Sequence, residues 1–334
     1  MNYKYPLKII ISGGRALGGV TSFAEGLRAG FTELGVPAEV ISPLQIFLHG
    51  RELRNPRILK ILSTSAVFAA PLARRAICMA HGVTRAHLQG FWKMMAVVAT
   101  FKLANASGGA QLVAVSDYVA AHLQTIFNLR IDAVVRNPLR PAFLESAEHL
   151  SAERNFITYV GVLDAVKNLH LLLPAMREVL EENPGMRICI AGDGPQRAQL
   201  EALAGGDERI EFPGVLDAIQ VRELLRRSRV FISGTPTEAL GIAYLEALSQ
   251  GCAVAMPAAG GGLEIAPEQI GGGVQLFSAL LDRASVASAL RRALASPPKA
   301  IPVAAYAPRA VAEAYLATDA RFSARGRFHA EAGR

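Results

Sequence analysis

Short apolar runs alternate with amphipathic stretches along most of the chain. A continuous apolar run bounded by glycine or proline is typical of a buried strand, and apolar spacing of three or four residues is typical of a helix. We therefore predict strands at 7–12, 36–42, 76–80 and 112–116, and a short strand with a turn at 133–138. Further strands are predicted at 156–161, 187–192, 210–213, 230–233, 252–256 and 274–277. This alternation predicts an α/β protein with two successive Rossmann-like parallel sheets that face a cleft.

A polar, unpatterned segment at residues 144–155 separates the two series of strands. We place a first Rossmann-like domain at residues 1–147, a second at 148–307, and a final helix with its tail at 308–334. A proline-rich break precedes that helix, which we expect to end at about Phe322 before a frayed polar tail.

Composition limits the class of protein. With 334 residues, 51% hydrophobic and 19% charged, the chain has a globular composition and the length for two cores. Three cysteines without C-x-x-C spacing argue against a disulfide framework or a zinc site. Residues 1–8 lead into the first strand without a signal-peptide pattern, and no apolar run reaches ~18 residues. We therefore expect a cytoplasmic protein.

Basic residues are concentrated in the first half of the chain. Residues 1–150 hold 16 Lys and Arg against 8 Asp and Glu, whereas residues 151–334 hold 19 against 20. Two interpretations stay open for the cluster around Phe91 and Trp92. It is either a patch that docks peripherally on an anionic membrane at its inner face, where each basic residue adds about 1 kcal/mol, or a set of solvated helix faces. No nucleic-acid recognition motif accompanies the charge, so nucleic acid is not an expected partner.

The fourth strand of the second series is followed by the stretch with the clearest chemistry. A polar loop carries Glu238, and a helix starts at Gly241. The amides of Gly241, Ile242 and Ala243 lie in the first helical turn, where unpaired N–H groups and the helix dipole favour an anion. Glu246 follows on an apolar helix, where a buried carboxylate requires a ligand or a basic partner. Because open α/β sheets bind ligands at the carboxyl ends of their strands, we predict a ligand site here.

Glycines also cluster after the first predicted strand, at residues 13–19. They fit neither the G-x-G-x-x-G pattern nor a P-loop. Gly18 and Gly19 therefore indicate either a bare turn or a loop that approaches an anion through its backbone. His81 follows the strand predicted at 76–80, where a functional side chain and a structural histidine are both consistent with the pattern.

Together these residues resemble the family 4 glycosyltransferases, retaining enzymes of the GT-B fold that use nucleotide-sugar donors. The signature is Glu238-x7-Glu246 with Gly241 inside it. Further matches, in chain order, are Gly18-Gly19, His81-Gly82, 113–116, 137–143, 159–163, Lys167-Asn168, 191–195, 212–214, Gly251, Gly260-Gly261 and Glu264. Each match is weak alone, but their order and spacing are specific, and they cover about residues 7 to 320.

The resemblance implies how the donor would be bound. Glu238 would accept hydrogen bonds from hydroxyls of the donor sugar, and Glu246 from the ribose hydroxyls. Lys167 would neutralise the diphosphate, which the amides at the start of the helix would also bind.

The resemblance also assigns contacts outside that stretch. The backbone of Gly214, Val215 and Leu216 would flank the nucleobase. The glycine loop of the first domain would close over the phosphates or the sugar, and His81 would lie near the transferring sugar. The final helix would cross back to the first domain.

The implied activity is that of a retaining hexosyltransferase. It would move a sugar from a nucleoside diphosphate sugar to a saccharide or lipid-linked saccharide, in bacterial polysaccharide or glycolipid assembly. The first domain would bind the acceptor and the second the donor. No D-x-D motif is present, so we expect metal-independent transfer without a cofactor. The alternatives are a nucleotide-sugar epimerase or a phosphorylase on the same fold, and a non-catalytic nucleotide-sugar-binding homologue.

One position departs from the family pattern. Val162 stands where the family usually has an arginine, directly after the glycine that ends a strand. A guanidinium able to bind phosphate in bidentate fashion is therefore missing. We expect weaker donor binding, or compensation by Arg15 from the glycine loop of the first domain.

Overall fold

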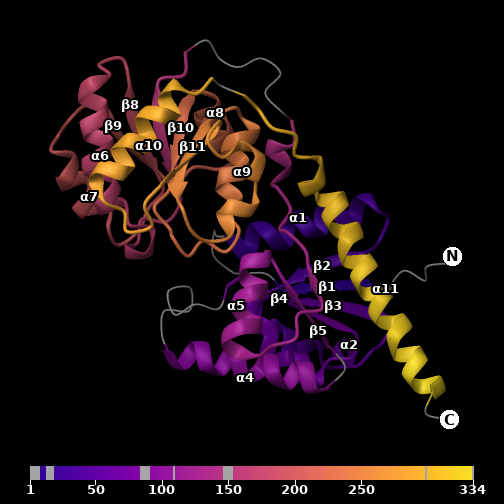
Figure 1. The fold of residues 1–334 in the computed structure, drawn as a ribbon. Coiled ribbons are helices and arrows are strands. Elements are labelled where there is room, and N and C mark those ends of the chain that lie inside the picture. The colour runs from indigo at the N-terminus through magenta and orange to yellow at the C-terminus, as the bar shows by residue number, and fades with distance from the viewer. Residues whose placement is uncertain are drawn as a thin grey trace. The chain divides into compact units, whose positions relative to one another are not determined.

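The computed structural model describes residues 8–12, 19–82, 91–107, 110–145, 153–297 and 299–332 (Figure 1). For residues 19–21, 107 and 321–332 it describes the backbone alone. The chain divides into two compact units, which are described separately. Unit 1 consists of Met1–Pro141 and Ala304–Arg334, and unit 2 of Ala142–Val303.

Unit 1 is built on a parallel six-stranded sheet with the order β2-β1-β3-β4-β5-β6. Its strands are β1 (Lys8–Ser12), β2 (Ala38–Ile41), β3 (Ile58–Leu62), β4 (Ala76–Ala80), β5 (Ala110–Ala114) and β6 (Ala133–Val134). Side chains on both faces of the inner strands are buried, including Ile9, Ile10 and Ile11. This is the pattern of a parallel sheet covered on both sides.

The helices of unit 1 include several short 3-10 turns. Its elements are α1 (Gly19–Glu33), η1 (Gln45–His49), α2 (Gly50–Leu53), η2 (Thr64–Leu72), α4 (Phe91–Ser107), α5 (Asp117–Phe127), η7 (Ala304–Tyr306) and α11 (Pro308–Ala332), and η3 (Pro141–Phe143) lies at the boundary with unit 2. Ser116 caps α5, since its hydroxyl accepts from the amide of Val119 at 3.1 Å.

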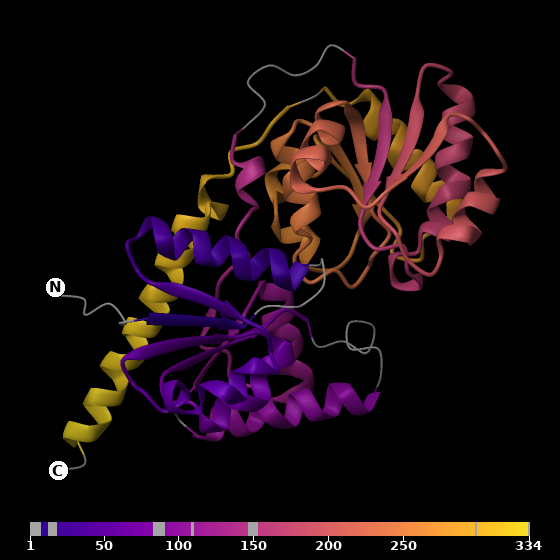
Figure 2. The ribbon, with the colours of Figure 1, turned by 180° about the vertical axis from the view of Figure 1, so that it is seen from behind.

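The C-terminal helix α11 returns to unit 1, as the family resemblance implied, and packs along α1 (Figure 2). A Cβ atom at Gly30 of α1 would lie 2.0 Å from the carbonyl oxygen of Pro308, so only glycine permits this approach. Asp319 of α11 is buried and binds Arg75, with Oδ2 2.6 Å from Nη2. The predicted end at about Phe322 is wrong. The backbone stays helical to Ala332, because residues 323–332 are mostly good helix formers and contain no proline.

Unit 2 contains a second parallel six-stranded sheet, with the order β12-β11-β10-β7-β8-β9. Its strands are β7 (Phe156–Val160), β8 (Arg187–Ala191), β9 (Ile210–Gly214), β10 (Ser228–Ile232), β11 (Ala253–Pro257) and β12 (Val274–Phe277). Its helices are η4 (Ala165–Lys167), α6 (Leu169–Glu182), α7 (Arg197–Ala204), α8 (Ala218–Arg226), α9 (Ile242–Ser249), η5 (Gly261–Glu264), η6 (Pro267–Gln269) and α10 (Arg283–Ala295). Two open α/β sheets were predicted, and two are found.

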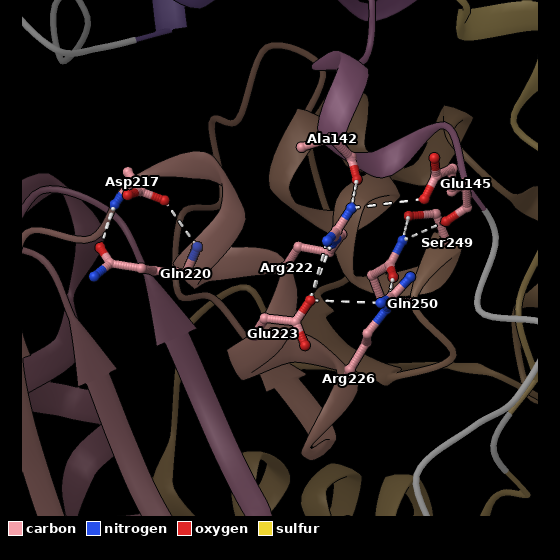
Figure 3. A network of polar contacts seen from close by, with 9 residues as sticks. All are labelled: Ala142, Glu145, Asp217, Gln220, Arg222, Glu223, Arg226, Ser249 and Gln250. Carbon is pink, nitrogen blue, oxygen red and sulfur yellow. Dashed lines mark hydrogen bonds and ion pairs between the residues drawn. The ribbon is translucent and has the colours of Figure 1, made fainter.

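A polar network ties the first residues of unit 2 to its helices (Figure 3). The guanidinium of Arg222 on α8 donates to the carbonyl of Ala142 at 3.4 Å and lies 3.8 Å from the carboxylate of Glu145. The side-chain amide of Gln250, at the end of α9, donates to the carbonyl of Glu145 at 3.4 Å. The chain that enters unit 2 is therefore held by both helices before it reaches β7.

Candidate active site

The loops after four neighbouring strands of unit 2 meet at the carboxyl edge of the sheet. The amide of Gly192, after β8, donates to the carbonyl of Gly214 at the end of β9 at 2.7 Å. A Cβ atom at Gly192 would lie 1.8 Å from the carbonyl oxygen of Gly161, which follows β7. Small residues thus bring these loops together where α/β sheets bind ligands.

Lys167 and Glu238 meet at this edge. Asp164 caps the short turn η4 by accepting from the amide of Lys167 at 3.2 Å, which fixes the lysine backbone. Nζ of Lys167 lies 3.3 Å from Oε2 of Glu238, in the loop after β10. The two side chains are 28% and 23% exposed, so a ligand can reach this ion pair.

Asn168 holds the loops after β7 and β10 together. Its backbone is left-handed, with φ 54°, a conformation that asparagine tolerates better than most residues. Its Nδ2 atom donates to the carbonyl of Gly234 at 2.8 Å. The sequence indicated Asn168 only as a family match, and this positioning role was missed. A polar residue tolerant of positive φ beside a candidate lysine was the available signal.

Three glycines surround the start of α9. Gly241, the N-cap, has φ +81°, and a Cβ atom there would lie 2.5 Å from the ring of Tyr244. A Cβ atom at Gly262 would also lie 2.5 Å from that ring, and one at Gly260 2.8 Å from the carbonyl oxygen of Pro236. Gly241 has no side chain to cap the helix, so the amides of the first turn are left to the backbone or to a ligand.

Glu246 lies inside α9 and is 3% exposed, as predicted from the apolar sequence around it. Its neighbours Leu245 and Ala247 are fully buried. Glu238 and Glu246 therefore differ in environment, because the first is partly open to solvent and the second is enclosed.

Two buried tyrosines support the edge of the sheet. Burial, and then the negative charges of Asp164 and Glu238, raise the pKa of Tyr159, and burial followed by Glu238 raises the pKa of Tyr244. Both phenols therefore stay protonated at neutral pH. Tyr159 donates to the carbonyl of Val162 at 3.0 Å, and Tyr244 is hydrogen-bonded to Ser233.

The segment predicted to flank a nucleobase lies at the end of β9. Gly214 ends the strand with φ +81°, and Val215 is exposed. Arg197 of α7 donates from Nη2 to the carbonyl of Phe212 at 3.0 Å and packs beside Gly214. Gly214, Val215 and Leu216 thus present backbone at an open part of the same edge.

The remaining predicted residues belong to unit 1. His81 follows β4, its amide donates to Thr64 Oγ1 at 3.2 Å, and its ring packs edge-on against Phe23. Burial lowers the pKa of His81 to about 4, so the imidazole is neutral at pH 7. Its Nε2 atom has no hydrogen-bond partner in the described parts of the chain. Gly19 opens α1, whereas Gly18 and Arg15 lie outside the described residues.

Val162 is 49% exposed, so the position of the missing arginine is open at the surface of unit 2. Within the residues that the structure describes, no group of three His, Cys, Asp or Glu side chains is placed to hold a metal ion. In the same residues, no helix has the length and apolar character needed to cross a bilayer.

Comparison with known proteins identifies a glycosyltransferase domain in unit 2. Residues 143–308 match the family model of glycosyl transferases group 1. The chain is 32% identical over 167 residues, 49% of its length, to 31% of the sulfoquinovosyl transferase SQD2 of Arabidopsis thaliana. It is 28% identical over 153 residues, 44% of its length, to 33% of the phosphatidylinositol N-acetylglucosaminyltransferase gpi3 subunit of Schizosaccharomyces pombe. The chain thus spans about a third of the length of these curated relatives.

The fold is similar over a larger part of the chain. The crystal structure of Anabaena Alr3699/HepE, in complex with UDP and glucose, aligns with a TM-score of 0.71 over 93% of this chain and 99% of that one, at 15% identity. At this identity the likeness concerns the fold. The chain has the GT-B fold, and its residues 143–308 form a glycosyl transferases group 1 domain.

Proposed function

We propose that this chain is a retaining, family 4 type glycosyltransferase that moves a sugar from a nucleoside diphosphate sugar to an acceptor hydroxyl. The observation that carries the proposal is the Lys167–Glu238 ion pair at 3.3 Å, at the carboxyl edge of the unit 2 sheet. A Cβ atom at Gly241 would lie 3.3 Å from Cγ of Glu238, so the start of α9 adjoins this pair. A cation, a carboxylate and helix amides therefore adjoin one another in a group 1 domain.

The arrangement suits departure of a diphosphate. The bond between C1 of the sugar and the phosphate oxygen breaks while the acceptor oxygen bonds to C1 on the same face. The acceptor proton passes to the leaving phosphate oxygen. Negative charge grows on the diphosphate in this step, and Lys167 with the amides of Gly241, Ile242 and Ala243 would stabilise it.

The carboxylates would orient the donor. Glu238, partly exposed beside the lysine, would bind the sugar hydroxyls, and buried Glu246 the ribose hydroxyls. The contacts expected from His81 and from Gly18 and Gly19 in unit 1, and of Gly214 to Leu216 with the nucleobase, are parts of the same proposal. So is transfer without a metal or cofactor.

We further propose an acceptor from polysaccharide or glycolipid assembly. The name of the gpi3 relative specifies phosphatidylinositol, and WaaG, a structural neighbour with a TM-score of 0.65, is described as involved in lipopolysaccharide biosynthesis. These names suggest a lipid or lipid-linked saccharide, and the bacterial setting is our inference.

Calorimetric titration with a panel of nucleoside diphosphates and their sugars tests donor binding first. Incubation of the best donor with lipid and saccharide acceptors then tests transfer, and the NMR coupling of the anomeric proton reports retention. Glu246→Gln should nearly abolish transfer, whereas exposed Glu268→Gln serves as the matched control. Wild-type rates for Glu246→Gln would overturn the site assignment, and an inverted product would overturn retention. Loss of activity in EDTA, restored by a divalent ion, would overturn metal-independent transfer.

The alternatives predict different results in the same assays. An epimerase converts the donor without acceptor, and a phosphorylase requires free phosphate. A non-catalytic homologue binds the donor without turnover across the acceptor panel.

A further inference from the structure

Unit 1 has an open surface hollow lined by apolar and basic side chains. Residues of η1, α2 and η2 line this hollow, whose volume is about 550 Å³. Phe47 and Leu72 contribute its apolar wall, and Arg51 and Arg54 its charged wall. None of the residues that line it belongs to the transferase site proposed above.

Large apolar side chains are exposed around the hollow. Leu48 is 84% exposed, and Leu44, Phe47 and Leu72 are each more than half exposed. The rings of Phe47 and Phe68 stack, with centroids 5.1 Å apart, so η1 and η2 share one apolar surface. Single exposed leucines are ordinary, but a contiguous set of this kind marks an interaction surface. We call these five residues, with Arg51 and Arg54, the basic apolar face.

Helix α4 packs against η2 and also exposes large apolar side chains. It buries Val98 and Phe101, yet Trp92 on its other side is 82% exposed, and Phe91 and Leu103 are exposed too. A helix that is apolar on its solvent side is unusual for a surface helix. Tryptophan is enriched where an apolar phase meets water, because its ring is apolar and its N–H is polar.

The charge around this surface has one sign. Between Leu44 and Ser107 the described and exposed charged side chains are all basic, namely Arg51, Arg54, Arg57, Arg74, Lys93 and Lys102, and the one acidic residue of this stretch is Glu52. That carboxylate is already bound by His49 and by Lys8, the latter at 3.0 Å, and the hydrogen bond from His49 is the main cause of its lowered pKa. Arg51 and Arg54 are exposed, and no described residue forms an ion pair with either.

We propose that the basic apolar face, together with the exposed side of α4, docks on the surface of an anionic lipid bilayer. The arginines would pair with lipid phosphates, while Leu44, Leu48 and Trp92 would enter the headgroup region. A second copy of the chain is a poorer occupant. A two-fold dimer through this surface would bring Arg51 and Arg54 of both copies together, and like charges repel.

Vesicle co-sedimentation of the full chain tests the proposal without donor or acceptor, so its result is independent of the transferase assignment. We expect binding to vesicles of equal parts phosphatidylcholine and phosphatidylglycerol, and little binding to phosphatidylcholine alone. Arg51→Glu with Arg54→Glu should lower partitioning at least about tenfold, because each basic residue near such a surface adds about 1 kcal/mol. Leu48→Ser with Trp92→Ser should also lower it, and should blunt any blue shift of tryptophan fluorescence, since Trp92 is the sole tryptophan.

Matched controls lie outside the surface. Leu280→Ser replaces a leucine of unit 2 that is 88% exposed, and Arg309→Glu replaces an exposed arginine of α11. Both controls should bind as the wild type does. Equal binding to both vesicle types, or undiminished binding of the two double variants, would overturn the proposal. Light scattering that shows a dimer lost in Leu48→Ser with Trp92→Ser would instead assign the surface to a second copy.

Discussion

Nζ of Lys167 lies 3.3 Å from Oε2 of Glu238, although the two residues are 71 positions apart in the chain. The pairing of β10 with β7 makes this contact, because it places the loops that follow these strands side by side. Two residues that were predicted separately as site residues thus form one ion pair. With a diphosphate bound, the lysine would have a second anionic partner.

Lys167→Met should remove the cation and keep the aliphatic stem. We expect kcat to fall about 10²- to 10³-fold, the usual loss when one group that stabilises transition-state charge is removed. Lys167→Arg should restore part of the rate. The exposed lysine of unit 2, Lys299, provides the control as Lys299→Met. An unchanged kcat/KM in Lys167→Met would show that the ion pair is structural.

Gly241→Ala should harm the site through backbone strain and a steric clash. Its φ of +81° disfavours a side chain, and the new Cβ would lie 2.5 Å from the ring of Tyr244. Gly271→Ala is a matched control, because its φ is +85° but no atom lies within 4 Å of the new Cβ. Backbone strain should lower the unfolding free energy of each variant by about 1 kcal/mol. The clash with Tyr244 should lower that of Gly241→Ala further. Chemical denaturation measures the difference, and equal losses would contradict the close packing of Tyr244.

Asp319→Ala should loosen the attachment of α11 to unit 1. The buried carboxylate binds Arg75, which is itself mostly buried, with atoms 2.6 Å apart. Removing it should cost about 2–3 kcal/mol of unfolding free energy. Glu313→Ala breaks the exposed pair with Arg309 on the same helix and should cost at most about 0.5 kcal/mol. Similar thermal midpoints for the two variants would argue against a structural role for the Arg75–Asp319 pair.

His81 should make stability depend on pH. Burial lowers the pKa of its imidazole from 6.5 to about 4 in the folded protein. Between these values the unfolded state binds more protons, so stability should fall as the pH drops from about 6.5 toward 4. Comparing His81→Gln with the wild type by denaturation at several pH values isolates this contribution. An identical pH dependence in both proteins would mean that the imidazole is solvated.

Most of the strands could be predicted from the sequence, because parallel strands covered on both faces are continuous apolar runs. β4 and β12 lie where they were expected. The strand β3 was missed, because Lys60 interrupts its apolar run. Lys60 is fully buried, and its Nζ donates to the carbonyl of Asn55 at 2.7 Å and to that of Arg74. The fold brings these two carbonyl groups to Lys60, and no local sequence pattern indicates that they will lie there.

The residues of the candidate site could be predicted from the sequence more fully than the contacts between them. Glu246 was expected to be buried from its apolar neighbours, and it is. The bond from Asn168 to Gly234 depends on strand order, since it joins loops 66 residues apart. The same holds for the packing of Gly262 against Tyr244. The spacing of residues along the chain can identify such residues, but it does not show which loops the strand order brings together.

The return of α11 to α1 has a consequence for synthesis. Unit 2 is one continuous segment, while unit 1 is assembled from both sides of it. The amide of Leu139 donates to the carbonyl of Tyr306 at 2.8 Å, so the outgoing and incoming connections are joined in unit 1. A ribosome therefore finishes all of unit 2 before α1 can meet the helix that covers it. Unit 1, whose sheet emerges first, is the last to be completed.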